Sequence, residues 1–124
     1  MHETVMAQQI VQAVLAEVDR RSASGVRSID VELGQLEGLR EETLRRAFRA
    51  EAIGTVLEET DLHVTVAPAV AFCPACNAPK AFDFVPPAEH GIPKASCPDC
   101  GADLEFRGGR GLIVRRATMV LEDP

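Results

Sequence analysis

The chain has 124 residues, of which 46% are hydrophobic and only 4% aromatic, and its formal net charge is −6. This length suits one ordinary domain with a small module, and the core must be aliphatic because Trp and Tyr are absent. The acidic balance argues against a nucleic-acid partner, which needs clustered Lys and Arg, and no apolar run is long enough for a membrane span.

The first predicted element is a helix over residues 4–21. Its apolar residues recur at three- and four-residue spacing, which is typical of a core-facing stripe. They are Val5, Met6, Ile10, Ala13, Val14 and Val18, with Val11 and Leu15 broadening the stripe. Arg20 and Arg21 give a cationic last turn, and the following Ser-Ala-Ser-Gly predicts a stop.

Two strands and a second helix follow. Residues 26–33 alternate and predict a half-buried strand, and residues 41–53 predict a helix that Gly54 ends. The apolar side of this helix is predicted to hold Leu44, Ala47, Phe48 and Ile53. Residues 62–68 predict another strand, with Leu62, Val64 and Val66 on one face. Strand, helix and strand over this length favour a crossover between parallel strands, and His63 is interpreted as a surface residue of its strand.

Two cysteine pairs come next, Cys73 with Cys76 and Cys97 with Cys100. Each C-x2-C turn points two sulfurs at one ion, so the two pairs predict a zinc ribbon with four thiolate ligands. Such a site has no open position, and it therefore builds structure without catalysing a reaction. Two disulfides and a redox-active pair are the alternatives. Gly101 follows the second pair, where a tight turn can need a positive φ.

The segment between the cysteine pairs contains three prolines and a glycine within residues 85–93. This composition predicts an exposed loop. His90 lies in it, either as a solvated residue or as an additional, transient ligand.

The last predicted strand covers residues 112–121, with Ile113, Ala117, Met119 and Leu121 on one face. This face needs a partner sheet larger than the ribbon, so the strand is predicted to return to the first domain. The expected fold is α+β, with two helices on a small three-stranded mixed sheet and an inserted zinc-ribbon module. The expected domains are residues 1–69 plus 110–124, and 70–109.

The N-terminus reads Met1-His2-Glu3. A bulky His2 should prevent removal of Met1, whose α-amine could then chelate a metal together with the amide and imidazole nitrogens of His2. Nitrogen-rich sets of this kind suit Ni²⁺ or Cu²⁺, and Glu3 can add a nitrogen or an oxygen. The alternative is an ordinary polar residue on a frayed terminus. There is no basic or apolar leader segment, and the cysteines all fall in a metal-type motif, which fits a cytoplasmic protein.

Several stretches occur together in a specific order along the whole chain. They are Met1-His2-Glu3; Val31-Glu32-Leu33-Gly34 with Leu36, Gly38, Glu42, Leu44, Ala47 and Phe48; the two C-x2-C pairs; and Leu112-Ile113-Val114-Arg115-Arg116-Ala117-Thr118-Met119. This combination resembles the HypA/HybF family of nickel metallochaperones for [NiFe]-hydrogenase maturation.

The resemblance implies a protein that is not an enzyme, with His2 as the essential nickel ligand and Met1 and Glu3 in support. It implies structural zinc at Cys73, Cys76, Cys97 and Cys100. The implied partners are a HypB-type GTPase and the [NiFe]-hydrogenase large subunit, and a homodimer is an open option.

Two departures from the family pattern concern the metal sites. The Pro-rich segment makes the gap between the cysteine pairs longer than the family pattern. Arg40 stands where some members have an acidic residue near the nickel, so a further ligand from the nearby Glu37, Glu41 or Glu42 stays open.

A zinc-ribbon adaptor of the transcription or translation machinery is the alternative function. It predicts a basic or aromatic face on the ribbon. Between the cysteine pairs only Lys80 and Lys94 are basic, and Asp83 and Glu89 oppose them, which counts against this alternative.

Overall fold

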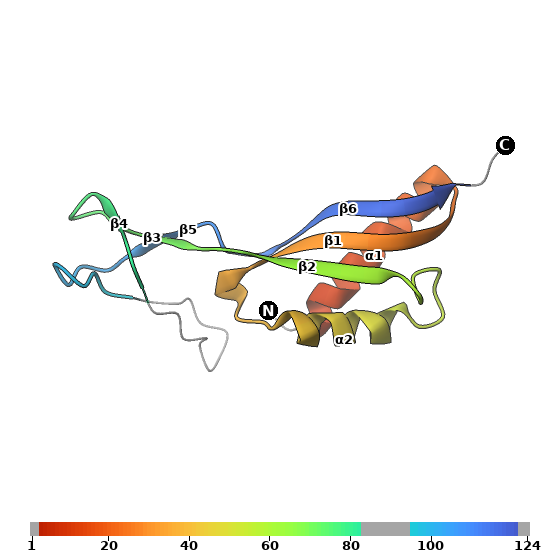
Figure 1. Cartoon of the computed structure of the whole chain (residues 1–124), viewed down its shortest axis with the longest axis horizontal. Helices are drawn as coiled ribbons and strands as arrows, with labels where there is room; N and C mark the ends of the chain where they lie inside the picture. The colour runs from red at the N-terminus through yellow and green to blue at the C-terminus, as the bar shows by residue number, and fades with distance from the viewer. Residues whose placement is uncertain (1–2, 83–94, 122–124) are drawn as a thin grey trace. The chain divides into compact units, whose positions relative to one another are not determined.

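The computed structural model describes residues 3–82 and 95–121 (Figure 1). The elements in chain order are α1 (Glu3–Arg21), β1 (Ala23–Gly34), the 3-10 turn η1 (Gln35–Glu37), α2 (Glu41–Ala52), β2 (Asp61–Ala67), β3 (Val70–Cys73), β4 (Ala78–Lys80), β5 (Glu105–Arg107) and β6 (Leu112–Leu121). They form two three-stranded sheets, in the orders β2-β1-β6 and β4-β3-β5. Neither described helix combines the length and apolar character that crossing a membrane requires.

The chain divides into two compact units. Unit 1 comprises Met1–Glu32, Leu39–Thr65 and Leu112–Pro124, and unit 2 comprises Leu33–Gly38 and Val66–Gly111. Unit 1 therefore holds both helices and most of the first sheet, whereas unit 2 holds the second sheet and all four cysteines.

Helix α1 has Glu3 in its first turn and Arg20 and Arg21 in its last, so the charges at both ends complement the helix dipole. Ser22 ends the helix with φ +52°, and β1 begins at the very next residue. The predicted stop after Arg21 is thus confirmed. One residue in the left-handed region completes the turn, so Ala23, Ser24 and Gly25 already belong to the strand, which was predicted to begin only at residue 26.

The buried face of α1 lies slightly to one side of the predicted stripe. It comprises Met6, Ala7, Ile10, Val11, Val14 and Val18. Val5 is 42% exposed and Ala13 is also exposed, so both predictions were wrong, while Ala7 is fully buried. Helix α1 packs against α2, and its buried face includes the small Ala7.

The sheet of unit 1 is mixed, as predicted. Strand β1 lies in the centre; β2 runs alongside it in the same direction, and β6 runs in the opposite direction (Figure 1). The buried residues of α2 and of the strands complete an aliphatic core with one aromatic ring. They are Leu44, Phe48 and Ala52 on α2, Ile29 and Val31 on β1, and Leu62 and Val64 on β2.

Helix α2 ends at Ala52, one residue before the predicted end. Ile53 has extended backbone geometry (φ −57°, ψ 131°), so its side chain leaves the apolar stripe and is 68% exposed, contrary to prediction. Gly54 follows with φ +79°, as expected of a glycine after a helix. Val66, expected on the buried face of its strand, is 47% exposed.

Strand β6 has the predicted bounds but a different alternation. Arg115 and Arg116 are both exposed, and this doublet shifts the pattern by one residue. Ile113 and Leu121 are consequently exposed, at 48% and 60%, whereas Val114, Ala117 and Met119 are half-buried. The assignment of Ile113 and Leu121 to the inner face was therefore wrong.

Unit 2 is built around β3, which pairs antiparallel with β4 and β5. Its buried core is small and comprises Ala71, Cys73, Cys97 and Leu104. Partly buried residues pack against this core, among them Phe82 and Phe106, whose ring centroids lie 5.0 Å apart in an edge-to-face arrangement. The segment 85–93, predicted to be an exposed loop, lies outside the described residues.

The turn η1 belongs to unit 2. Hydrogen bonds connect it and the preceding Gly34 to two other segments of this unit, one around Gly109 and the other at Ala69. The amide nitrogen of Leu36 donates to the carbonyl oxygen of Gly109 at 2.7 Å, and that of Gly34 donates to Gly111 at 2.8 Å. The Gln35 side-chain oxygen accepts a hydrogen bond from the Ala69 amide at 2.9 Å. Gly34 and Gly109 approach so closely that a Cβ on Gly34 would clash with the Gly109 carbonyl.

Candidate metal centre

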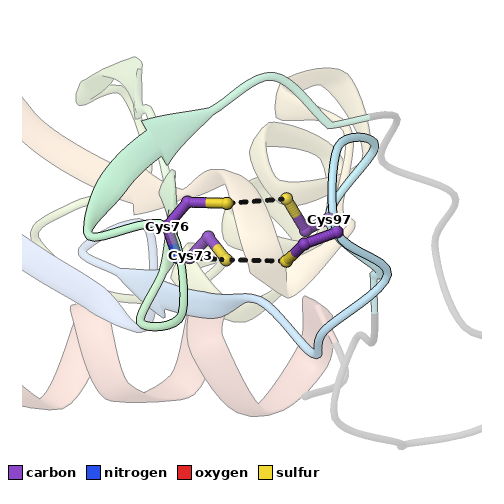
Figure 2. Close-up of side chains that lie close together, drawn as sticks. Cys73, Cys76 and Cys97 are labelled. Atoms are coloured by element: carbon purple, nitrogen blue, oxygen red, sulfur yellow. Dashed lines mark hydrogen bonds between the residues drawn. The ribbon is translucent and has the colours of Figure 1, made fainter.

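The four cysteines converge in unit 2, although Cys76 and Cys97 are 21 positions apart in the sequence. Cys73 is the last residue of β3, Cys76 lies in the turn that follows, and Cys97 and Cys100 lie in a second turn. Figure 2 shows the sulfurs of the two turns facing one another. All four Sγ atoms lie within 4.8 Å of one another.

The distances between the sulfurs fit a tetrahedral metal site. Cys73 Sγ lies 3.5 Å from Cys100 Sγ, and Cys76 Sγ lies 4.0 Å from Cys97 Sγ. Four thiolates at the usual Zn–S distance of about 2.3 Å are separated by about 3.8 Å along each tetrahedron edge, which lies between these two values. A disulfide needs about 2.05 Å, and all four cysteines are free thiols, so this structure does not contain the disulfide alternative.

The two turns have the same design. In each pair the first cysteine is buried and the second exposed. The residue after each pair has a left-handed backbone, Asn77 at φ +54° and Gly101 at φ +76°. The predicted positive φ of Gly101 is thus confirmed, and Asn77 was missed, although Asn is one of the few side chains that adopts this conformation readily.

Hydrogen bonds brace each turn. The Cys76 amide donates to Cys73 Sγ at 3.3 Å in the first turn, and the Gly101 amide donates to the Cys97 carbonyl at 2.9 Å in the second. Each turn is thus held by a hydrogen bond of its own.

The thiols of Cys97 and Cys76 differ in pKa. Burial opposes ionisation of Cys97, but hydrogen bonds from the backbone of Asp99 and Cys100 outweigh it and lower the pKa of Cys97 to about 7. Hydrogen bonds with Cys100 and Cys73 raise the pKa of Cys76 to about 12. One thiolate therefore forms readily, whereas its neighbour keeps its proton until a cation compensates the charge.

An ion pair that the sequence did not predict connects the two turns. Lys80 Nζ, at the end of β4, lies 2.5 Å from Asp99 Oδ2, inside the second C-x2-C turn. The hydrogen bond to Asp99 is the main reason why the pKa of Lys80 is raised. Its ammonium group also offsets part of the negative charge that four thiolates bring.

The candidate nickel ligands fall in a different part of the chain. Glu3 is the first residue of α1 and is partly buried, whereas Met1 and His2 lie outside the described residues. Within residues 3–82 and 95–121, the four cysteines are the only group of three or more Cys, His, Asp or Glu side chains close enough to share an ion.

The other candidate ligands lie at separate places in the chain. Glu37 Oε2 accepts a hydrogen bond from the Gly111 amide at 2.9 Å, and Glu41 pairs with Arg45 at 3.4 Å. Glu42 and His63 are exposed, the latter as a surface residue of β2, as predicted. His90 lies outside the described residues.

A small α+β unit joined to a four-cysteine ribbon is the architecture of a metal-binding protein. The family model described as "Hydrogenase/urease nickel incorporation, metallochaperone, hypA" matches residues 1–119. The chain belongs to this HypA family of metallochaperones, and the resemblance inferred from its motifs is confirmed.

Curated relatives match along nearly their whole length. The hydrogenase maturation factor HypA of Chlorobium limicola is 32% identical over 120 residues, covering 96% of this chain and 97% of the relative. HypA 1 of Bradyrhizobium diazoefficiens is 34% identical, with 93% and 96% covered. HybF of Escherichia coli is 30% identical, again with 93% and 96% covered.

Solved structures agree in fold. The solution structure of the Ni metallochaperone HypA from Helicobacter pylori superposes with a TM-score of 0.63 at 17% identity, covering 98% of this chain and 100% of that one. A second HypA solution structure gives 0.64 at 16% identity, covering 98% of both chains. The predicted α+β fold, with two helices on a small three-stranded mixed sheet, is thus confirmed.

Proposed function

We propose that this chain binds Ni(II) at its N-terminus and delivers it during [NiFe]-hydrogenase maturation, while Zn(II) on the four cysteines stabilises the ribbon. The observation that carries the proposal is the match of a nickel-incorporation family to residues 1–119, a range that begins with Met1-His2-Glu3. Curated relatives with the same extent are hydrogenase maturation factors.

The chemistry of the cysteine cluster supports a division of labour between two metals. Four thiols around one point leave no open coordination position, and soft sulfur ligands select zinc in such a geometry. An ion held in this way stabilises the small core around Cys73 and Cys97 and is unsuited to being handed on. Cargo nickel therefore needs a separate site with exchangeable nitrogen and oxygen ligands.

The N-terminus supplies such ligands in this proposal. The Met1 amine, the His2 nitrogens and Glu3 bind nickel, with His2 essential. Residues 1–69 and 110–124 form the nickel domain, and residues 70–109 form the zinc ribbon.

The remaining roles follow from hydrogenase maturation. The protein acts in the cytoplasm as a carrier without catalysing a reaction. It meets a HypB-type GTPase and the hydrogenase large subunit, either as a monomer or as a homodimer.

Calorimetric titration of the tag-free, zinc-loaded protein with Ni²⁺ tests the nickel site. We expect one nickel per chain in the wild type, and no binding in His2→Ala or after a Gly-Ser extension before Met1. His63→Ala is the matched control, because it removes an exposed histidine elsewhere in the nickel domain and should leave the titration unchanged.

Zinc content, measured by mass spectrometry of the metals, should stay at one per chain in all four proteins. Unchanged nickel affinity in His2→Ala would refute the N-terminal site. Loss of zinc from the same variant would show that the two sites are not independent.

A further inference from the structure

Strand β6 has an open edge. It ends the strand order β2-β1-β6, and within the described residues no strand pairs with its outer side. The opposite edge strand β2 is partly covered, because Arg45 Nε donates a hydrogen bond to the Leu62 carbonyl at 3.1 Å. The β6 backbone accepts a side-chain hydrogen bond from the neighbouring strand β1, where Ser24 Oγ donates to the Val120 carbonyl at 3.1 Å.

A groove of about 570 Å³ runs between this strand and α1 within unit 1. Its apolar lining comes from both elements. These residues are Ala13 and Val14 on α1, and Val114, Ala117, Met119 and Leu121 on β6. A strand placed beside β6 would direct every second side chain toward α1, into this groove.

The charge of the groove is opposite to that of the whole chain. Its charged lining consists of Arg21, Arg115 and Arg116 against the single acid Glu17, in a chain of net charge −6. Glu17 is already shared between Arg21 at 3.1 Å and Arg20 at 2.8 Å. Arg115 pairs with Glu32 at 2.7 Å, whereas Arg116 has no ion-pair partner among the described residues.

We propose that the outer edge of β6 and the groove beside α1 bind an extended, acidic segment of a partner protein. The segment adds to the sheet as a fourth strand. Its backbone pairs with β6, its apolar side chains contact Ala117 and Met119, and its carboxylates lie near Arg116. The ten residues of β6 span about 33 Å, enough for a segment of up to about ten residues.

Charge favours a partner over a second copy of this chain. Two copies joined symmetrically through β6 would bring the exposed doublet Arg115 and Arg116 of both strands into one interface. An acidic strand instead meets these arginines with opposite charge, which speeds association and fixes the register.

The proposal is tested with the zinc-loaded full chain and a fluorescein-labelled ten-residue peptide of alternating Val and Glu, by fluorescence anisotropy. We expect saturable binding that Arg116→Glu weakens by about tenfold or more, with most of the loss at low salt. Arg46→Glu is the matched control, because it reverses another exposed arginine outside the groove, on α2, and should leave binding within about twofold. A peptide with Lys in place of Glu should bind about tenfold more weakly than the original.

Two further peptides test backbone pairing. One is N-methylated at the odd positions and the other at the even positions, so each loses the amide donors of one edge. We expect one of them to lose binding and the other to keep it, because only one peptide edge faces β6.

Three results would overturn the proposal. They are no binding of the original peptide up to about 1 mM, equal binding by Arg116→Glu and wild type, and equal effects of the two N-methylated peptides. A dimer of the wild-type chain that sedimentation equilibrium detects and the original peptide dissociates would likewise overturn the proposal and assign the edge to a second copy.

Discussion

Lys80 and Asp99 form an ion pair, Nζ to Oδ2 at 2.5 Å, that ties the strand after the first cysteine turn to the interior of the second. Only 16% of the Lys80 side chain is exposed, and charges on Cys76 and Cys97 contribute to the rise in its pKa. We expect Lys80→Met to weaken zinc binding by about tenfold, because neighbours of the ligands position them and balance their charge. Competition with a chromophoric chelator measures the change.

Asp99→Asn should have a similar effect, and the double variant should lose little more than either single one. Glu105→Gln is the control, since it removes a charge from the same unit at an exposed pair with Arg107, 3.9 Å apart. Equal affinities for wild type and Lys80→Met would show that the pair is incidental to metal binding.

Stripping the metal from the four cysteines should unfold unit 2 selectively. Two of the four residues in the buried cluster around the cysteines are Cys73 and Cys97 themselves, so little apolar surface holds this part of the unit together without an ion. The amide NMR signals of Ala71 and Leu104 should collapse on adding a chelator, while the helical circular dichroism of α1 and α2 persists. The same chelator pre-saturated with zinc serves as the control, and a parallel loss of helix signal would contradict this expectation.

Gly34→Ala should destabilise the protein by about 1–3 kcal/mol, the usual range for forcing atoms into a packed site. The added methyl group would clash with the backbone of Gly109 and Arg110, which cannot move aside as a flexible side chain could. Urea denaturation followed by the amide signals of unit 2 measures the effect. Gly25→Ala, also on β1, has open space around its Cβ and should be nearly neutral; equal costs at both positions would reject the steric explanation.

Phe48→Ala should cost about 3–5 kcal/mol, because this ring is 1% exposed in the centre of the unit 1 core and its loss leaves a cavity. Ile53→Ala removes a large apolar side chain from the end of the same helix, but that side chain is 68% exposed. Its effect should stay within about 0.5 kcal/mol. Urea denaturation followed by circular dichroism distinguishes the two, and a cost above about 1.5 kcal/mol for Ile53→Ala would show that it packs in solution.

Sequence periodicity predicted the bounds of three long elements closely, whereas β1 begins three residues before the strand predicted over residues 26–33. The bounds of β6 were correct at both ends, and each helix differed by a single residue at one end, because repeats over ten or more residues define an element clearly. The cysteine spacing likewise predicted the convergence of four sulfurs, since two C-x2-C turns at this separation are typical of a shared metal site.

Features that depend on single backbone angles or on distant residues were not predictable in this way. Ile53 left its face because one residue switched from helical to extended geometry, and Arg115 with Arg116 shifted the alternation of β6. The pair of Lys80 and Asp99 joins residues 19 positions apart, and nothing in the local sequence of either one indicates the other.

Strands β3 and β5 place Val70 opposite Arg107 as register partners, so the chain enters and leaves the cysteine-bearing segment at neighbouring points. The residues between β3 and β5 can therefore be removed or exchanged as one piece. Replacing it with a two-residue Asn-Gly turn would join two strands that are already paired, without changing their direction. The same adjacency would let evolution lengthen, shorten or exchange the ribbon in one step, which gives a physical reason why its length can vary independently of the helices.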